Sequence, residues 1–172
     1  NTDVLLDLHR KQNLTALLQA VRENRVINPR GTEPINVKSM FEVITGPHSH
    51  RFHRDVVART PWTRQFYSRR TTGPKGETIE DLTEWTRIHW DNLVLKPERG
   101  YSGKGVRVGG SHANADEAIA LAVKEGHYIV QEKVPLPIWS EDMPVVDFEK
   151  EAITLMFCQT DFRCLMGPEG LF

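Results

Sequence analysis

Apolar residues recur along the chain at two spacings, and each spacing predicts one kind of secondary structure. Recurrence every three or four residues predicts amphipathic helices at residues 13–24, 35–44, 48–57, 78–89 and 114–124. Short apolar runs between turn residues predict strands at residues 4–6, 26–28, 93–96, 105–108, 127–132, 145–159 and 161–166. The polar, turn-rich stretch 69–76 predicts a loop. These elements predict an α+β protein, and the strand–helix–strand order at the start is typical of the end of a parallel α/β unit.

Two of the predicted helices have a well-defined apolar face. In the first, at residues 78–89, the face holds Leu82, Trp85, Ile88 and His89. In the second, at residues 114–124, the face holds Ala118, Ile119, Ala122 and Val123, and Gly126 follows as an expected helix end.

A glycine-rich, basic segment separates a predicted strand from its predicted hairpin partner. Gly100, Gly103 and Gly105 let the main chain approach an anion closely and turn several N–H groups toward it. Lys104 adds a flexible positive charge, and Lys96 reaches the same position from the end of the strand. The pattern indicates a phosphate site, although an ordinary hairpin turn with exposed lysines accounts for it equally well.

The glycines do not open a helix, and this excludes two familiar phosphate-binding loops. A P-loop ends in Gly-Lys-Ser/Thr at a helix N-terminus, whereas here Gly-Lys leads into a strand beginning at Gly105. The dinucleotide fingerprint also needs a helix on its glycines. Further along, Gln131–Val134 runs into Pro135, which is typical of a stiff connector whose backbone groups meet an adenine edge.

Three pieces of the chain resemble the ATP-grasp superfamily in their order and approximate spacing. They are Val94-Leu95-Lys96-Pro97, Gly100-Tyr101-Ser102-Gly103-Lys104-Gly105-Val106 and Ile129-Val130-Gln131-Glu132-Lys133-Val134. Asn28-Pro29, Asn36-Val37-Lys38 and Pro61-Trp62-Thr63 resemble the family's approach to its nucleotide-binding region. The resemblance covers roughly residues 26–165, and Asp91 to Pro97 is most similar to uncharacterised, circularly permuted ATP-grasp proteins.

The resemblance implies an ATP-grasp nucleotide-binding subdomain, an antiparallel sheet with packed helices. Lys38 and Lys96 would contact the ATP phosphates. A mobile flap over the triphosphate would consist of Gly100, Ser102, Gly103, Lys104 and Gly105. The segment flanking the adenine would consist of Gln131, Glu132, Lys133 and Val134.

Two further roles follow from the same resemblance. Glu141 would reach the ribose, and Arg163 would lie near the substrate as the candidate catalytic residue. The implied cofactors are ATP and Mg²⁺. No Glu-x-Asn or Asp-x-Asn follows Arg163, so we assign no metal ligand here and expect the magnesium ligands outside this chain.

The function implied is that of the ATP-binding part of an ATP-dependent carboxylate–amine ligase that acts through an acyl phosphate. The alternative is a non-catalytic nucleotide-binding or partner-docking module on the same scaffold. The chain lacks an initial Met and the metal ligands, so we expect a fragment that is inactive alone. Its expected parts are the end of an α/β unit with linking helices (1–59), the small subdomain with the flap (60–135) and the start of a second lobe (136–172).

Composition limits the partners. The 172 residues carry a formal net charge of -1, with 39% hydrophobic and 26% charged residues, which are ordinary globular values. Neither nucleic acid nor a membrane is an expected partner. ATP and a small carboxylate are the expected partners, and two cysteines without a disulfide framework favour a cytoplasmic location.

Two clusters of polar residues are open to a structural or a functional interpretation. Three histidines form a candidate metal group or, more simply, surface and capping residues: His48, His50 and His53. Three arginines form a grip for an acidic substrate or a solvated loop: Arg64, Arg69 and Arg70.

Overall fold

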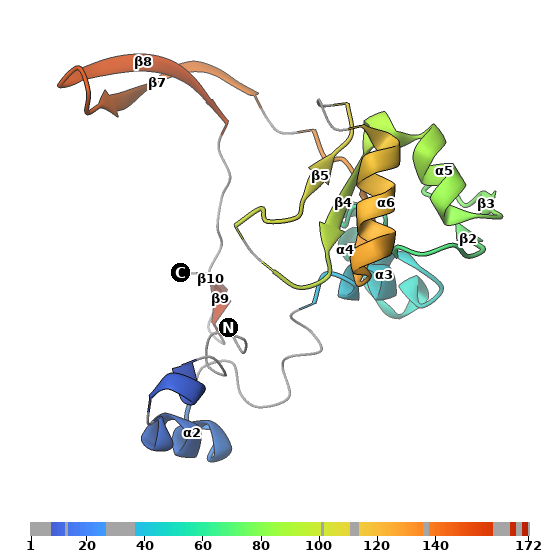
Figure 1. Ribbon diagram of the computed structural model, residues 1–172, viewed down its shortest axis with the longest axis horizontal. Helices are drawn as coiled ribbons and strands as arrows, with labels where there is room; N and C mark the ends of the chain where they lie inside the picture. The colour runs from blue at the N-terminus through green and yellow to red at the C-terminus, as the bar shows by residue number, and fades with distance from the viewer. Residues whose placement is uncertain are drawn as a thin grey trace. The chain divides into compact units, whose positions relative to one another are not determined.

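The computed structural model describes residues 8–12, 14–26, 37–100, 102–110, 114–135, 138–159, 166–167 and 170–171, with the backbone alone at 138–143 and from 156 onward. The chain forms two compact units, Asn1–Lys133 and Val134–Phe172. Both contain antiparallel strands, and the first also contains several helices (Figure 1). The predicted α+β class is therefore confirmed.

A four-stranded antiparallel sheet lies at the centre of the first unit, in the order β1–β6–β4–β5. Its strands are β1 (Thr63–Gln65), β4 (Leu93–Pro97), β5 (Arg107–Val108) and β6 (Tyr128–Glu132). β4 lies between β6 and β5 and pairs with β6 along its whole length. The predicted strands at 93–96 and 127–132 are confirmed, and β5 is the predicted hairpin partner across the glycine segment.

One face of the sheet carries the hydrophobic core. Helix α6 (Ala115–Glu125) packs against β4 and β6, and α5 (Leu82–Ile88) packs against α6 (Figure 1). Leu95 and Val130 lie opposite each other in the sheet and are fully buried in one cluster with Ala122. Burial of one such aliphatic side chain contributes about 1.5–3 kcal/mol. This core fixes which side of each strand points away from the helices.

Both core helices begin at a side-chain cap. The Asn114 carboxamide oxygen accepts from Asp116 N at 2.8 Å, and the Asp81 carboxylate accepts from Thr83 N at 2.7 Å. α6 ends at Gly126, where φ is 68°, in the left-handed region that glycine tolerates best. The helix predicted at 114–124, with Gly126 past its end, is confirmed.

The helix predicted at 78–89 begins later than expected. Thr78–Ile79 forms β3, which pairs with β2 (Thr71–Thr72), so the loop predicted at 69–76 contains the first half of a small hairpin. Threonine and isoleucine are β-branched and favour extended backbone. The helix therefore begins only at Leu82, after its N-cap residue Asp81.

The apolar faces of α5 and α6 are narrower than predicted. Ile88 is 76% exposed and Val123 is 57% exposed, whereas Leu82 and Ala122 are completely buried. Thr86 is instead completely buried. Its hydroxyl donates to the Leu82 carbonyl at 2.7 Å, so it needs no hydrogen-bond partner outside the helix.

The N-terminal helices are shorter than predicted. They are α2 (Thr15–Arg22), α3 (Met40–Thr45), the 3₁₀ turn η2 (Ser49–Arg51) and α4 (Arg54–Arg59). α3 starts late because the backbone N–H of Lys38 donates to the Glu98 carbonyl at 3.1 Å instead of entering the helix. The helix predicted at 48–57 is interrupted before α4, where the His53 ring accepts from Asp55 N at 3.3 Å. The strands predicted at 4–6 and 26–28 fall outside the described residues, apart from Val26.

The second unit is a hairpin followed by two short strands. β7 (Ile138–Asp147) pairs with β8 (Ala152–Gln159), and β9 (Met166–Gly167) pairs with β10 (Gly170–Leu171). The chain reverses after Asp147, whose carboxylate accepts from Glu149 N and Lys150 N, both at 3.1 Å. The single extended segment expected at 145–159 is thus two strands. Within the described part, the partner of β8 is β7 rather than the predicted 161–166.

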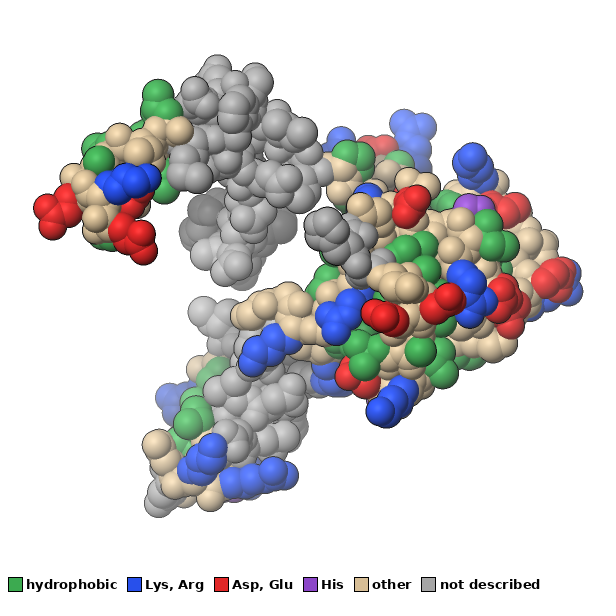
Figure 2. Space-filling view, turned by 45° about the horizontal axis from the view of Figure 1, so that its top comes forward, with side chains coloured by type: hydrophobic (Ala, Val, Ile, Leu, Met, Phe, Trp, Pro, Cys, Tyr) green, Lys and Arg blue, Asp and Glu red, His purple; other side chains and the backbone are tan. Residues whose placement is uncertain are grey.

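Charges of both signs are interspersed over much of the face drawn in Figure 2. The lower-left part of that view shows Lys and Arg side chains without Asp or Glu. No helix in the described part of the chain has both the length and the apolar composition that a bilayer crossing requires.

Removal of the α5 cap tests the local account of this fold. Hydrogen bonds from Ser68, Thr83 and the Glu84 backbone lower the pKa of Asp81 from 3.8 to about 2. Stability from this carboxylate is therefore complete above about pH 4 and lost as the pH falls toward 2. We expect Asp81→Ala to lower the free energy of unfolding by about 1 kcal/mol at pH 7. Chemical denaturation should show the difference shrinking near pH 2, and the exposed Glu80→Ala serves as control.

Candidate phosphate-binding site

The face of the sheet opposite α6 carries a polar row that crosses three strands. Lys96 of β4 and Gln131 of β6 are diagonal neighbours in the antiparallel register, since Val94 lies opposite Gln131 and Lys96 opposite Ile129. The Lys96 ammonium donates to Gln131 Oε1 at 2.7 Å. The structure thus places the Lys96 ammonium on the same face of the sheet as the Gln131 side chain.

Gln131 is itself held by β1. Its amide nitrogen donates to Thr63 Oγ1 at 2.8 Å, and the Thr63 hydroxyl donates to the Pro61 carbonyl at 2.9 Å. Gln131 and Thr63 are buried, with 6% and 0% of their surface exposed. The hydrogen bonds therefore form a continuous chain from the Pro61 carbonyl through Thr63 and Gln131 to Lys96.

Lys38 approaches the same region from the segment before α3. Its backbone N–H donates to the Glu98 carbonyl at 3.1 Å, and its ammonium donates to the Gly100 carbonyl at 2.9 Å. Both acceptors belong to the stretch that follows Lys96 directly. Two lysines distant in sequence are thereby brought to one end of β4.

The electrostatics of the pair are unfavourable without an anion. Burial lowers the pKa of Lys96, and the positive charge of Lys38 lowers it further. Burial also lowers the pKa of Lys38. In the described structure both ammonium groups donate to neutral oxygens, those of Gln131 and Gly100. A ligand with several negative charges would relieve this repulsion and replace the lost hydration.

The glycine segment runs between two fixed ends. At its start, Glu98 N donates to the His127 carbonyl at 2.7 Å, and the Glu98 carboxylate accepts from the Ser39 hydroxyl. At its end, the Tyr128 hydroxyl lies 3.2 Å from the Gly105 carbonyl and 2.7 Å from the Glu125 carboxylate. Burial, followed by the Glu125 contact, raises the pKa of Tyr128 to about 12, so this anchor stays protonated at neutral pH.

Between these ends the backbone takes conformations that favour glycine. φ is 119° at Gly100, 69° at Gly103 and 73° at Gly105, and Ser102 also has a positive φ of 59°. A Cβ at Gly105 would come within 2.7 Å of the Pro97 ring, whereas Gly100 and Gly103 have open space around them. Close packing thus requires glycine at position 105, whereas no atom lies close to Gly100 or Gly103 on the side where a Cβ would be. Ser102 and Lys104 are exposed there.

Glu132 and Lys133, also predicted to bind the nucleotide, lie toward the other end of β4 from the lysine pair, because Glu132 lies opposite Leu93 in the register. Glu132 is exposed and borders a different cavity, described below. The Lys133 ammonium donates to the Gly109 carbonyl at 3.0 Å, and its backbone N–H donates to the Asn92 carbonyl at 2.8 Å. Val134 is 56% exposed. The backbone of Glu141 lies in β7, its side chain is outside the described part, and Arg163 lies outside it altogether.

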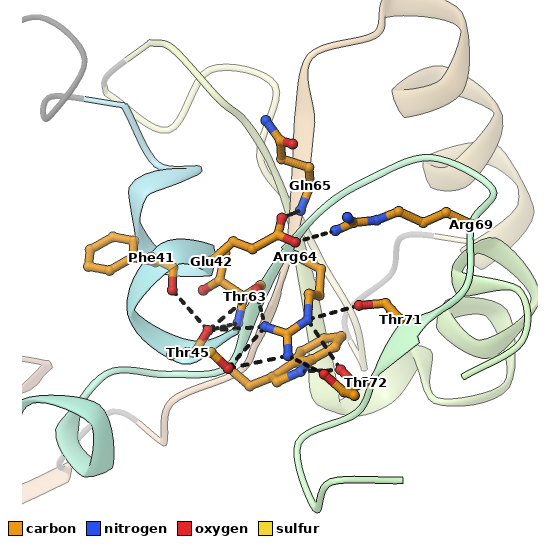
Figure 3. A network of polar contacts seen from close by, with 10 residues as sticks. Phe41, Glu42, Thr45, Thr63, Arg64, Gln65, Arg69, Thr71 and Thr72 are labelled. Carbon is orange, nitrogen blue, oxygen red and sulfur yellow. Dashed lines mark hydrogen bonds and ion pairs between the residues drawn. The ribbon is translucent and has the colours of Figure 1, made fainter. Parts of the chain in front are cut away.

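Arg64 is a buried structural residue, which the sequence analysis missed. The predicted substrate grip or solvated loop is wrong for this arginine, because only 1% of its surface is exposed. Its guanidinium donates to the carbonyls of Thr45, Thr63 and Thr72 and to the Thr71 hydroxyl, and it lies 5.0 Å from the centroid of the Trp62 ring (Figure 3). The sequence does contain a sign of this burial. Arg64 lies midway between Trp62 and Phe66, and these alternate residues of an extended segment are all buried.

The neighbouring arginines have other partners. Arg69 forms an ion pair with Glu42 at 2.6 Å, and Glu42 also accepts from Gln65 N at 2.6 Å (Figure 3). Arg70 forms an exposed pair with Glu80 at 3.3 Å. The three arginines therefore do not form one anion grip.

A cavity of about 640 Å³ lies beside Arg64 and is bordered by Trp62, Thr72 and Glu132. Because the donors of Arg64 already have neutral acceptors, the guanidinium is not presented to this cavity as a free cation. Among the described residues, no group of three His, Cys, Asp or Glu side chains is placed to hold a metal ion.

Comparison with known proteins adds no assignment. A scan against protein-family models and searches of curated proteins and of solved structures found no significant match to this chain. The geometry of the lysine pair and the sequence motifs are therefore the features that indicate a function.

Replacement of Arg64 tests its structural role. Lysine keeps the charge but lacks the planar fork of donors, so Arg64→Lys leaves buried carbonyls without partners. We expect it to lower the free energy of unfolding by at least about 2 kcal/mol. Denaturant titration should show a change of less than about 0.5 kcal/mol for the exposed control Arg70→Lys. Equal losses for the two variants would contradict the network in Figure 3.

Proposed function

We propose that this chain binds the triphosphate of ATP between Lys96, Lys38 and the glycine segment from Gly100 to Gly105. The observation that carries the proposal is the convergence of two half-buried lysines whose ammonium groups donate to neutral oxygens. The glycine segment beside them has positive φ angles and open space at Gly100 and Gly103, features that would allow backbone N–H groups to turn toward an anion. Its antiparallel hairpin placement agrees with the motif order that resembles the ATP-grasp superfamily.

We further propose that the protein is an ATP-dependent carboxylate–amine ligase and that this chain supplies its ATP-binding part. ATP would phosphorylate a substrate carboxylate, and an amine would displace the phosphate from the acyl phosphate. Lys96 and Lys38 would stabilise negative charge on the transferring phosphoryl group. Mg²⁺ would neutralise phosphate charge when bound, with its ligands expected outside this chain. The alternative is a module that binds nucleotide or a partner without chemistry. A nucleotide-binding module would use the same site but would not turn ATP over.

Triphosphate binding is tested by removing each charge in turn. We expect Lys96→Met and Lys38→Met each to weaken ATP binding about ten- to hundredfold, the effect of losing a charge-assisted hydrogen bond of about 1.5–3 kcal/mol. Calorimetry with ATP, ADP and AMP should show the loss growing with phosphate number. Lys124→Met, on the exposed side of α6, is the matched control. Equal ATP affinity in the Lys96 variant and the parent chain would contradict the proposal.

The chemistry is tested by the products formed by the complete natural protein. An acyl-phosphate ligase releases ADP and inorganic phosphate only when a carboxylate acceptor is present. Chromatographic analysis of nucleotide products across a panel of carboxylates and amines should show that dependence. Release of AMP and pyrophosphate would refute the mechanism, and ATP binding without turnover across the panel would favour the module.

A further inference from the structure

We propose that Gln131 is a positioning residue, which holds the Lys96 ammonium with a neutral acceptor so that its full charge remains available to a bound polyphosphate. The inference rests on the proposed function and assigns a role to a residue that itself need not touch the ligand. Its basis is the hydrogen-bond chain from Pro61 through Thr63 and Gln131 to Lys96.

The direction of every hydrogen bond in this chain is determined by chemistry. An ammonium has only donors, so the Gln131 group that faces Lys96 must be the amide oxygen. The amide nitrogen then faces the Thr63 oxygen, and the Thr63 proton goes to the Pro61 carbonyl. Rotating the amide by half a turn would set an NH₂ group against the ammonium. Gln131 is therefore locked in one orientation and fixes the end of a long, otherwise flexible side chain.

The neutrality of this acceptor has a consequence for binding. A carboxylate at position 131 would form a partly buried ion pair with Lys96 and compete with phosphate for it. Among the described residues, the charge that acts on Lys96 is Lys38, and the nearby Glu98 carboxylate is engaged by Ser39 and lies 4.0 Å from His127. The amide thus keeps two positive charges unneutralised at the end of β4.

The substitution Gln131→Glu changes the charge and preserves the shape. Two quantities are measured on the 172-residue chain: the dissociation constant for inorganic triphosphate, and the pH midpoint of Lys96 acetylation, followed by mass spectrometry without ligand. We expect triphosphate binding to weaken at least tenfold and the acetylation midpoint to rise. Gln19→Glu, the same change in α2 where Gln19 contacts Glu23, should alter neither.

A second variant separates charge from lost contact. Gln131→Met removes the acceptor without adding a charge, so we expect weaker triphosphate binding and no rise in the acetylation midpoint. It also keeps the inference testable if the Glu variant does not fold, which circular dichroism would show. Unchanged triphosphate affinity in both folded variants would overturn the role of Gln131. Failure of the parent chain to bind triphosphate would instead overturn the proposed function, and with it the phosphate part of this inference.

Discussion

The pairing of β4 with β6 is the constraint on which the rest of the site depends. Its antiparallel register sets Lys96 diagonal to Gln131 on one face, while Leu95 and Val130 enter the core on the other. A shift of one residue would bury the ammonium under α6 and expose the aliphatic side chains. The same aliphatic burial that stabilises the sheet therefore also determines where the positive charge lies.

A buried cation, Arg64, and a half-buried one, Lys96, illustrate opposite uses of charge in this unit. Arg64 has donors directed to several backbone and hydroxyl oxygens and stacks near Trp62, so its environment is complete without a ligand. Lys96 has a single described acceptor and a second ammonium nearby. The first arrangement joins α3, β1 and the β2–β3 hairpin. The second leaves the ammonium groups of Lys96 and Lys38 close together. Their repulsion lowers the stability of the protein without ligand, and a bound anion would relieve it.

The sequence predicts best where local pattern and tertiary packing agree. β4, β6 and α6 are of this kind, since each has a continuous apolar run or a side-chain cap with a terminal glycine. The sequence predicts less well where a tertiary hydrogen bond competes with a helical one. At Lys38 the backbone N–H donates to the Glu98 carbonyl, and α3 begins only at Met40. Arg64 was missed because a charged residue suggests solvent, and only the assembled sheet, hairpin and helix supply the acceptors that bury it. The pairing of Lys38 with Lys96 was predicted from the family resemblance, whereas the contact of Gln131 with Lys96 became evident only from the cross-strand geometry.

The most direct test of the central claim is a map of backbone and side-chain amide NMR shifts during titration with ATP. The account predicts saturable shifts for the amides of Gly100, Gly103 and Gly105 and for the side-chain NH₂ of Gln131. The amides of α2 and of the turn after Asp147 should remain unchanged. Shifts confined to the cavity beside Arg64, or no saturable shift in the glycine segment, would contradict it.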